Sequence, residues 1–123
     1  SGGLTSEREL EPGAAPPGLP SNLVPLYAEA QAIIALSPAS ACAILRIIIR
    51  SLIQERGLRG RHIGRDVAAL VDQGAPVGLL RALDVVSMTD DSAKNPAELK
   101  LVDGHSDAQN LTMFLHLLAD QTN

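Results

Sequence analysis

The stretch SPASACAILRIIIRSLIQERG, residues 37–57, constrains the fold more than any other part of the chain. Ten of the thirteen residues from 41 to 53 are apolar, and the exceptions are Arg46, Arg50 and Ser51. On a helical period Arg46, Arg50 and Gln54 share one narrow stripe, because each lies four residues from the next. A helix that is apolar around the rest of its circumference belongs in the middle of a bundle.

Five isoleucines in this stretch also suit a β-strand, because β-branched side chains favour extended backbone. The apolar run is nevertheless longer than a usual strand, and no turn residue interrupts it. Ser37 is a good N-cap, Pro38 a favoured first residue and Gly57 a natural stop. We therefore expect one helix from Ser37 to Gly57.

Four further helices are predicted from apolar periodicity and from capping residues. One begins near residue 21, a short one ends at Gly74, and the next opens at Pro76. The last begins with a capping box of Ser106 and Gln109. The residues expected to face the core are Leu23, Leu26, Tyr27, Ala30 and Ile34, then Ile63, Val67, Leu70 and Val71, then Leu79, Leu80, Leu83 and Val86, and finally Leu111, Phe114, Leu115 and Leu118. The fold class is all-α, a bundle of five helices.

Residues 1–20 are expected to be a disordered tail, and residues 21–123 to form a single helical domain. Five of the eight prolines fall by position 25, and such a segment buries too little apolar surface to offset its ordering entropy. Cys42 is the only cysteine, so no intrachain disulfide can form, and its apolar helix suggests a buried thiol in a reducing compartment. No signal peptide and no membrane span is predicted, which favours a cytoplasmic location.

Positive charge is concentrated in one part of a chain whose net charge is −4. Six of the ten basic residues lie between positions 46 and 65, against the single acid Glu55. These candidate anion- or partner-binding residues are Arg46, Arg50, Arg56, Arg59, Arg61 and Arg65. On the glycine-rich loop the arginines either contact phosphates or belong to a solvated, mobile loop without a partner, and we favour the second interpretation because the rest of the chain is acidic.

Arg46 and Arg50 lie on a helix that is mostly buried, where an unpaired charge would cost several kcal/mol. Either they line the one wet edge of that helix, or they pair with acids from another helix. The candidate acids are Asp84 and Asp66. We favour a structural ion pair over a clamp for an anionic ligand.

No metal site, cofactor or nucleophilic centre is predicted. Asp103, His105 and Asp107 alternate, but the twelfth position of a calcium loop counted from Asp103 is Phe114 rather than a glutamate. A polar turn and helix cap explains these residues better. Cys42 is expected to be inert because burial raises a thiol's pKa, and few aromatics are present to stack on bases.

Several segments together resemble a known family. Leu36-Ser37-Pro38, residues 41–46, residues 67–75 and residues 82–86 resemble a bacterial domain of unknown function found alone and within restriction-endonuclease polypeptides. That domain is similar to the helical HEPN superfamily, many of whose members are ribonucleases, toxins or defence modules. The resemblance covers the chain from about Asn22 onward and implies a helical scaffold that commonly dimerises.

A motif of that family, whose Arg and His resemble the catalytic pair of the HEPN superfamily, is degenerate in this chain. Members commonly continue Arg-x-x-Gly-Asn-x-Ala-x-His-Pro after the helix that ends at Val86. Here Ser87 stands at the Arg position and Asn95 at the His position, while Asp90 and Asp91 replace the Gly and Asn. Metal-free RNA cleavage needs a group that titrates near neutral pH and a cation for the phosphorane, and these residues supply neither.

The resemblance and the lost motif predict a non-catalytic HEPN-like domain that acts by protein association. A homodimer is expected first, or docking on another protein, in a phage-defence or toxin–antitoxin setting. The alternative is a module that binds or cleaves RNA through the basic loop 56–65. A third hypothesis is an anion or small-ligand pocket built on Arg46 and Arg50.

Overall fold

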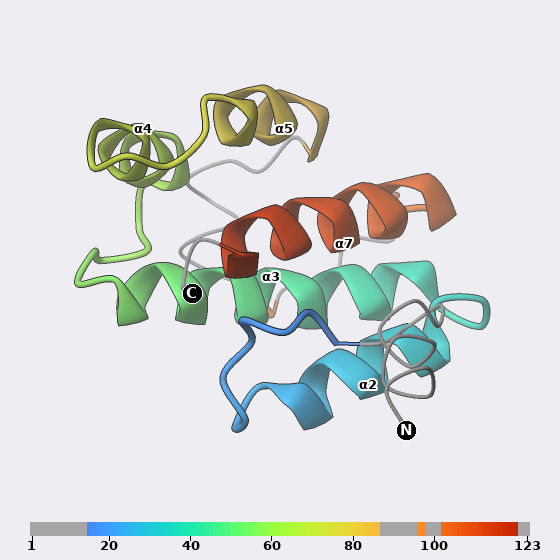
Figure 1. The fold of residues 1–123 in the computed structure, drawn as a ribbon. Coiled ribbons are helices and arrows are strands. Elements are labelled where there is room, and N and C mark those ends of the chain that lie inside the picture. Colours follow the sequence, from blue (N-terminus) through green and yellow to red (C-terminus); the bar gives the residue numbers. More distant parts are fainter. Residues whose placement is uncertain (1–14, 87–95, 98–101, 121–123) are drawn as a thin grey trace, which may run out of the picture.

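The predicted all-α bundle of five helices is confirmed in the computed structural model, which describes residues 15–86, 96–97 and 102–120. The helices are α2 (Val24–Ile33), α3 (Pro38–Glu55), α4 (Ile63–Asp72), α5 (Gly78–Val86) and α7 (His105–Asp120), and the described residues include no strand (Figure 1). The four degenerate motif positions, Ser87, Asp90, Asp91 and Asn95, lie outside the described residues.

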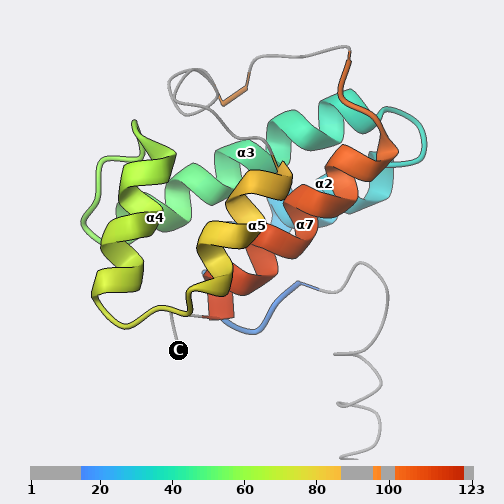
Figure 2. The ribbon, with the colours of Figure 1, turned by 90° about the horizontal axis from the view of Figure 1, so that it is seen from above.

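The helix α3 is the centre of the bundle. It packs against α2 on one side and α7 on the other, and α5 in turn packs against α7 and α4 (Figures 1 and 2). Its ends are those that the sequence predicts. The Ser37 side chain accepts a hydrogen bond of 3.4 Å from the Ser40 amide, and Gly57 follows the helix with φ of +86°.

The solvent exposure of the polar stripe on α3 increases along the helix. Arg46 is buried, Arg50 is half-buried and Gln54 is exposed, because the helix emerges from between α2 and α7 toward its C-terminal end (Figure 1). The ten buried residues of α3 include Leu45, Ile48 and Ile49 on its apolar side. The central position that the apolar pattern predicts for α3 is therefore correct. Its polar stripe, however, is exposed to solvent only toward the C-terminal end.

The packed unit begins earlier than the expected boundary at residue 20. Leu19 is only 7% exposed and belongs to the core, and Ala15 packs against it. A turn closed by a hydrogen bond of 3.0 Å from the Leu19 amide to the Pro16 carbonyl directs Leu19 inward. Residues 15–20 thus belong to the bundle because one leucine among the prolines supplies apolar surface. The expected disorder of residues 1–14 concerns residues outside the described part.

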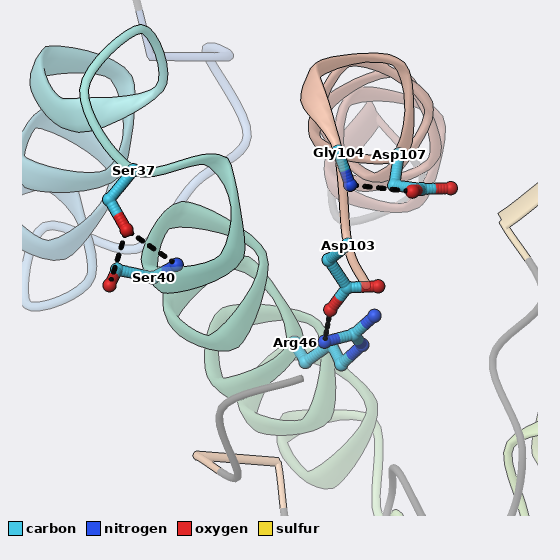
Figure 3. A network of polar contacts seen from close by, with 6 residues as sticks. All are labelled: Ser37, Ser40, Arg46, Asp103, Gly104 and Asp107. Carbon is cyan, nitrogen blue, oxygen red and sulfur yellow. Dashed lines mark hydrogen bonds and ion pairs between the residues drawn. The ribbon is translucent and has the colours of Figure 1, made fainter. Parts of the chain in front are cut away.

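The start of α7 differs from the prediction. The helix begins at His105, so Ser106 lies inside its first turn and the predicted capping box of Ser106 and Gln109 is wrong. Instead Gly104 accepts the first helical hydrogen bond, from the Ala108 amide at 3.1 Å. The Gly104 amide in turn donates to Asp107 at 2.8 Å (Figure 3). An acid three residues after the cap performs the role that we assigned to Gln109.

Most residues predicted to face the core do so. Leu23, Tyr27, Ala30, Ile63, Val67, Leu70, Leu79, Leu111, Phe114, Leu115 and Leu118 are buried. Leu26, Ile34, Val71, Leu80 and Leu83 are half-buried, and the side chain of Val86 lies outside the described part. Within the described part of the chain, no helix is both long enough and apolar enough to cross a membrane.

Candidate functional site

Arg46 is held in a structural ion pair. Its guanidinium donates to the Asp103 carboxylate at 2.8 Å, and the two side chains are 6% and 10% exposed (Figure 3). A pairing with an acid of another helix was predicted, with Asp84 and Asp66 as candidates. The partner is instead Asp103, which lies outside the helices, and the side chain of Asp84 lies outside the described part. Asp103 immediately precedes the cap of α7, and packing of α7 along α3 brings it to this position. Arg46 is therefore committed to the fold and is not a free ligand for an anion.

Asp66 has a different role, since it anchors the arginine-rich loop. Its carboxylate accepts a hydrogen bond of 2.9 Å from the Gly60 amide, and the side chain is buried at the start of α4. An acid in the first turn of a helix is also favoured by the helix dipole. Asp66 thus ties the loop to α4.

A second contact fixes the same loop to α3. The Gln54 side-chain amide donates to the Arg59 carbonyl at 3.2 Å. Gly60, with φ of +75°, lies so close to α3 that a Cβ atom would stand 2.9 Å from Cγ of Arg50. Glycine at position 60 permits this close approach, which a larger residue would prevent. The loop thus contacts both α3 and α4, while its expected mobility stays a prediction.

Five arginines lie on the loop or on the adjoining turns of α3 and α4, and none forms an ion pair with a side chain that the structure describes. Arg50 and Arg56 are half-buried, whereas Arg59, Arg61 and Arg65 are exposed. The Nε atom of Arg50 and an Nη atom of Arg56 are buried without a hydrogen-bond partner. A shallow pocket of about 480 Å³ is lined by Arg50, Gln54, Leu58, Arg59 and Arg61. We call this pocket the arginine cradle.

A second surface feature lies between α2 and α7 and was not predicted. The two helices are bridged by a hydrogen bond of 2.7 Å between the Tyr27 hydroxyl and His116 Nε2, and by another of 3.1 Å from Gln31 to Thr112. Burial raises the pKa of Tyr27 and lowers the pKa of His116, so both groups are neutral at neutral pH. The bridge therefore adds no charge to this side of the bundle.

Beside this bridge the surface is hollow, with an apolar part and a polar part. A depression of about 790 Å³ is lined by Ala28, Ala32, Ile34, Ala35 and Met113, with polar groups from the first turns of α7. Met113 is 63% exposed, and Leu117, one turn further along α7, is 40% exposed. Val24, the first residue of α2, is exposed as well. We call these exposed apolar residues of α2 and α7 the α2–α7 face.

The α2–α7 face was not predicted, because on these two helices we sought only the apolar residues that face the core. Val24, Ala28 and Ala32 recur at intervals of four and form a second apolar stripe on α2. Glu29 is the only charged residue of that helix. A helix with a second, exposed apolar stripe was therefore visible in the sequence.

Neither a metal site nor a reactive thiol is found among the described residues. They contain no group of three or more His, Cys, Asp and Glu side chains placed to hold a metal ion. Asp107 caps α7 and Asp103 pairs with Arg46, as expected for a polar turn and helix cap. Burial, reinforced by the nearby Asp103 carboxylate, raises the pKa of Cys42 to about 11. The thiol is therefore protonated and unreactive at neutral pH.

Comparison with known proteins assigns the chain to no family. No family model, no curated protein and no solved structure matches it.

Proposed function

We propose that this chain is a non-catalytic, HEPN-like helical domain that acts by association, and that it forms a homodimer through the α2–α7 face. The observation that carries the proposal is the exposed apolar surface around the depression between α2 and α7. The degenerate positions Ser87 and Asn95 support the absence of ribonuclease activity. The resemblance to defence modules makes a phage-defence or toxin–antitoxin setting part of the same proposal.

The composition of the α2–α7 face supports a protein partner. Interface cores are depleted in charged residues and enriched in methionine and aromatic side chains. Glu29 is the only charged residue of α2, and the charged residues of α7, Asp107 and Asp120, lie near its two ends. Between these ends Met113 and Leu117 are exposed. An apolar surface of this kind associates because burial removes it from water.

The shape of the α2–α7 face favours a second copy of the same chain. In a twofold dimer the same patch meets itself, so that a protrusion and a hollow must lie side by side on one surface. Met113 is 63% exposed and lines the depression together with small alanine side chains of α2. Methionine is flexible enough to fill an irregular hollow, so each copy can insert Met113 into its partner.

Sedimentation velocity over a range from low to high micromolar concentration tests the dimer. We expect the wild-type chain to shift from monomer to dimer, and Met113→Glu to weaken self-association by at least about tenfold, because a carboxylate in an apolar interface is costly to desolvate. Val77→Glu is the matched control, since Val77 is 58% exposed at the opposite end of the bundle.

Two outcomes would contradict this assignment. A wild-type chain that remains monomeric at high micromolar concentration removes the homodimer. A dimer that survives Met113→Glu but is lost in Val77→Glu places the interface elsewhere. Circular dichroism of each variant verifies that the helices are intact, which is expected because both substituted side chains are exposed.

A further inference from the structure

The arginine cradle concentrates positive charge at the end of α3. Between residues 50 and 66 five arginines accompany two acids, Glu55 and Asp66. Like charges at this density repel one another, and guanidinium groups form their strongest hydrogen bonds with phosphate and carboxylate oxygens. A bound anion would relieve that repulsion, whereas the described part of the chain supplies no ion-pair partner to any of the five.

The cradle is held in shape before any ligand arrives. Its loop is fixed to α3 by the Gln54 hydrogen bond to the Arg59 carbonyl and to α4 by the Gly60 hydrogen bond to Asp66. Arg59 and Arg61 flank Gly60, so their backbone positions follow from these two contacts. Preorganised donors lose less conformational entropy on binding than donors on a flexible loop.

Arg50 supplies the floor of the cradle. Its stem lies under Gly60, where a Cβ atom would come within 2.9 Å of Cγ. Its Nε atom is buried and has no hydrogen-bond partner, and the side chain lines the pocket together with Arg59 and Arg61. Because Nε is closed to solvent, an oxyanion in the pocket would be bound by the terminal N–H groups of the Arg50 guanidinium, and their charge-assisted hydrogen bonds would be strong.

The charge of the remaining chain limits the size of the ligand. Thirteen of the fourteen acidic residues but only four of the ten basic residues lie outside residues 46–65. The net negative charge of this remainder opposes a long polyanion such as RNA, whereas a compact anion needs only the charge of the cradle. We therefore propose that the arginine cradle binds a compact phosphate-bearing small molecule, held by the guanidinium groups of Arg50, Arg59 and Arg61.

Pyrophosphate is the probe for this site, because it presents adjacent phosphate groups without a base or sugar. Isothermal titration at constant ionic strength, with chloride replacing pyrophosphate in the reference, should show saturable binding. Arg59→Gln combined with Arg61→Gln should weaken that binding by about tenfold or more, as expected when two charge-assisted contacts are removed. Arg81→Gln, which changes an exposed arginine on α5 outside the cradle, is the matched control and should bind as the wild type does.

A nuclear magnetic resonance titration supplies a second measurement that does not depend on affinity alone. Pyrophosphate should shift the Nε–H resonance of Arg50 and the amide resonance of Gly60 in the wild type. In the double variant, the same shifts should require at least about tenfold more pyrophosphate. Equal binding by the double variant and the wild type would overturn the proposal. Binding of single-stranded RNA without binding of pyrophosphate would overturn it as well, and would favour the nucleic-acid function of loop 56–65.

Discussion

At the scale of single residues, the contact between Arg46 and Asp103 shows how one ion pair joins distant parts of the chain. The two side chains are 6% and 10% exposed and their charged atoms lie 2.8 Å apart. Removing one partner of a buried pair leaves the other charge unsolvated. We expect Arg46→Met to lower the free energy of unfolding by about 3 kcal/mol, measured by urea denaturation.

The same pair allows a double-mutant cycle. Asp103→Asn alone should also destabilise the protein, and the combination with Arg46→Met should cost less than the sum of the two single changes, because the second substitution removes the charge that the first left unpaired. Additive losses would show that the two side chains act independently. Arg81→Gln, on the exposed surface of α5, is expected to change the free energy of unfolding by less than about 0.5 kcal/mol.

At the scale of elements, local signals in the sequence located most helices, while contacts between elements remained hidden. Ser37, Pro38 and Gly57 mark α3 because caps depend on neighbours within a few residues. The pairing of Arg46 with Asp103 spans 57 positions, so no local pattern specifies it. Asp66 was considered as a partner for an arginine. It instead accepts a hydrogen bond from the Gly60 amide, a backbone donor only six residues away in the sequence.

The loop between α3 and α4 provides a prediction at this scale. Gly57 and Gly60 both have positive φ, but nothing lies within 4 Å of a Cβ placed at Gly57, whereas at Gly60 Cγ of Arg50 would be 2.9 Å away. Gly57→Ala should therefore cost only the backbone strain of about 1–2 kcal/mol. Gly60→Ala should cost more than this, because the stem of Arg50 must also move. Urea denaturation of both variants measures the difference, and equal losses would mean that the loop does not press on α3.

At the scale of the whole molecule, the order of the helices along the chain does not reveal which of them meet. The apolar pattern of residues 41–53 placed α3 at the centre correctly, because only a central helix can bury most of its circumference. The candidate surfaces were less accessible to sequence reasoning. The arginines of the cradle were recognised by their charge, but the contacts of Gly60 and Gln54 that shape it depend on three elements meeting. To predict the α2–α7 face, one must know which side of each helix is covered by the rest of the bundle.

Because α3 contacts both α2 and α7, its one thiol reports on opening of the whole bundle. Cys42 is fully buried, and its pKa is raised to about 11, first by burial. A thiol reagent should therefore modify it only after α2 or α7 separates from α3, and the modification rate should rise with urea with the slope of global unfolding. Ala68→Cys in a Cys42→Ala background is the matched control, since residue 68 on α4 is exposed outside the α2–α7 face and should react rapidly without urea. A rate at Cys42 that does not depend on urea would show that α3 is uncovered by a local motion, and would contradict a bundle that unfolds around it as one unit.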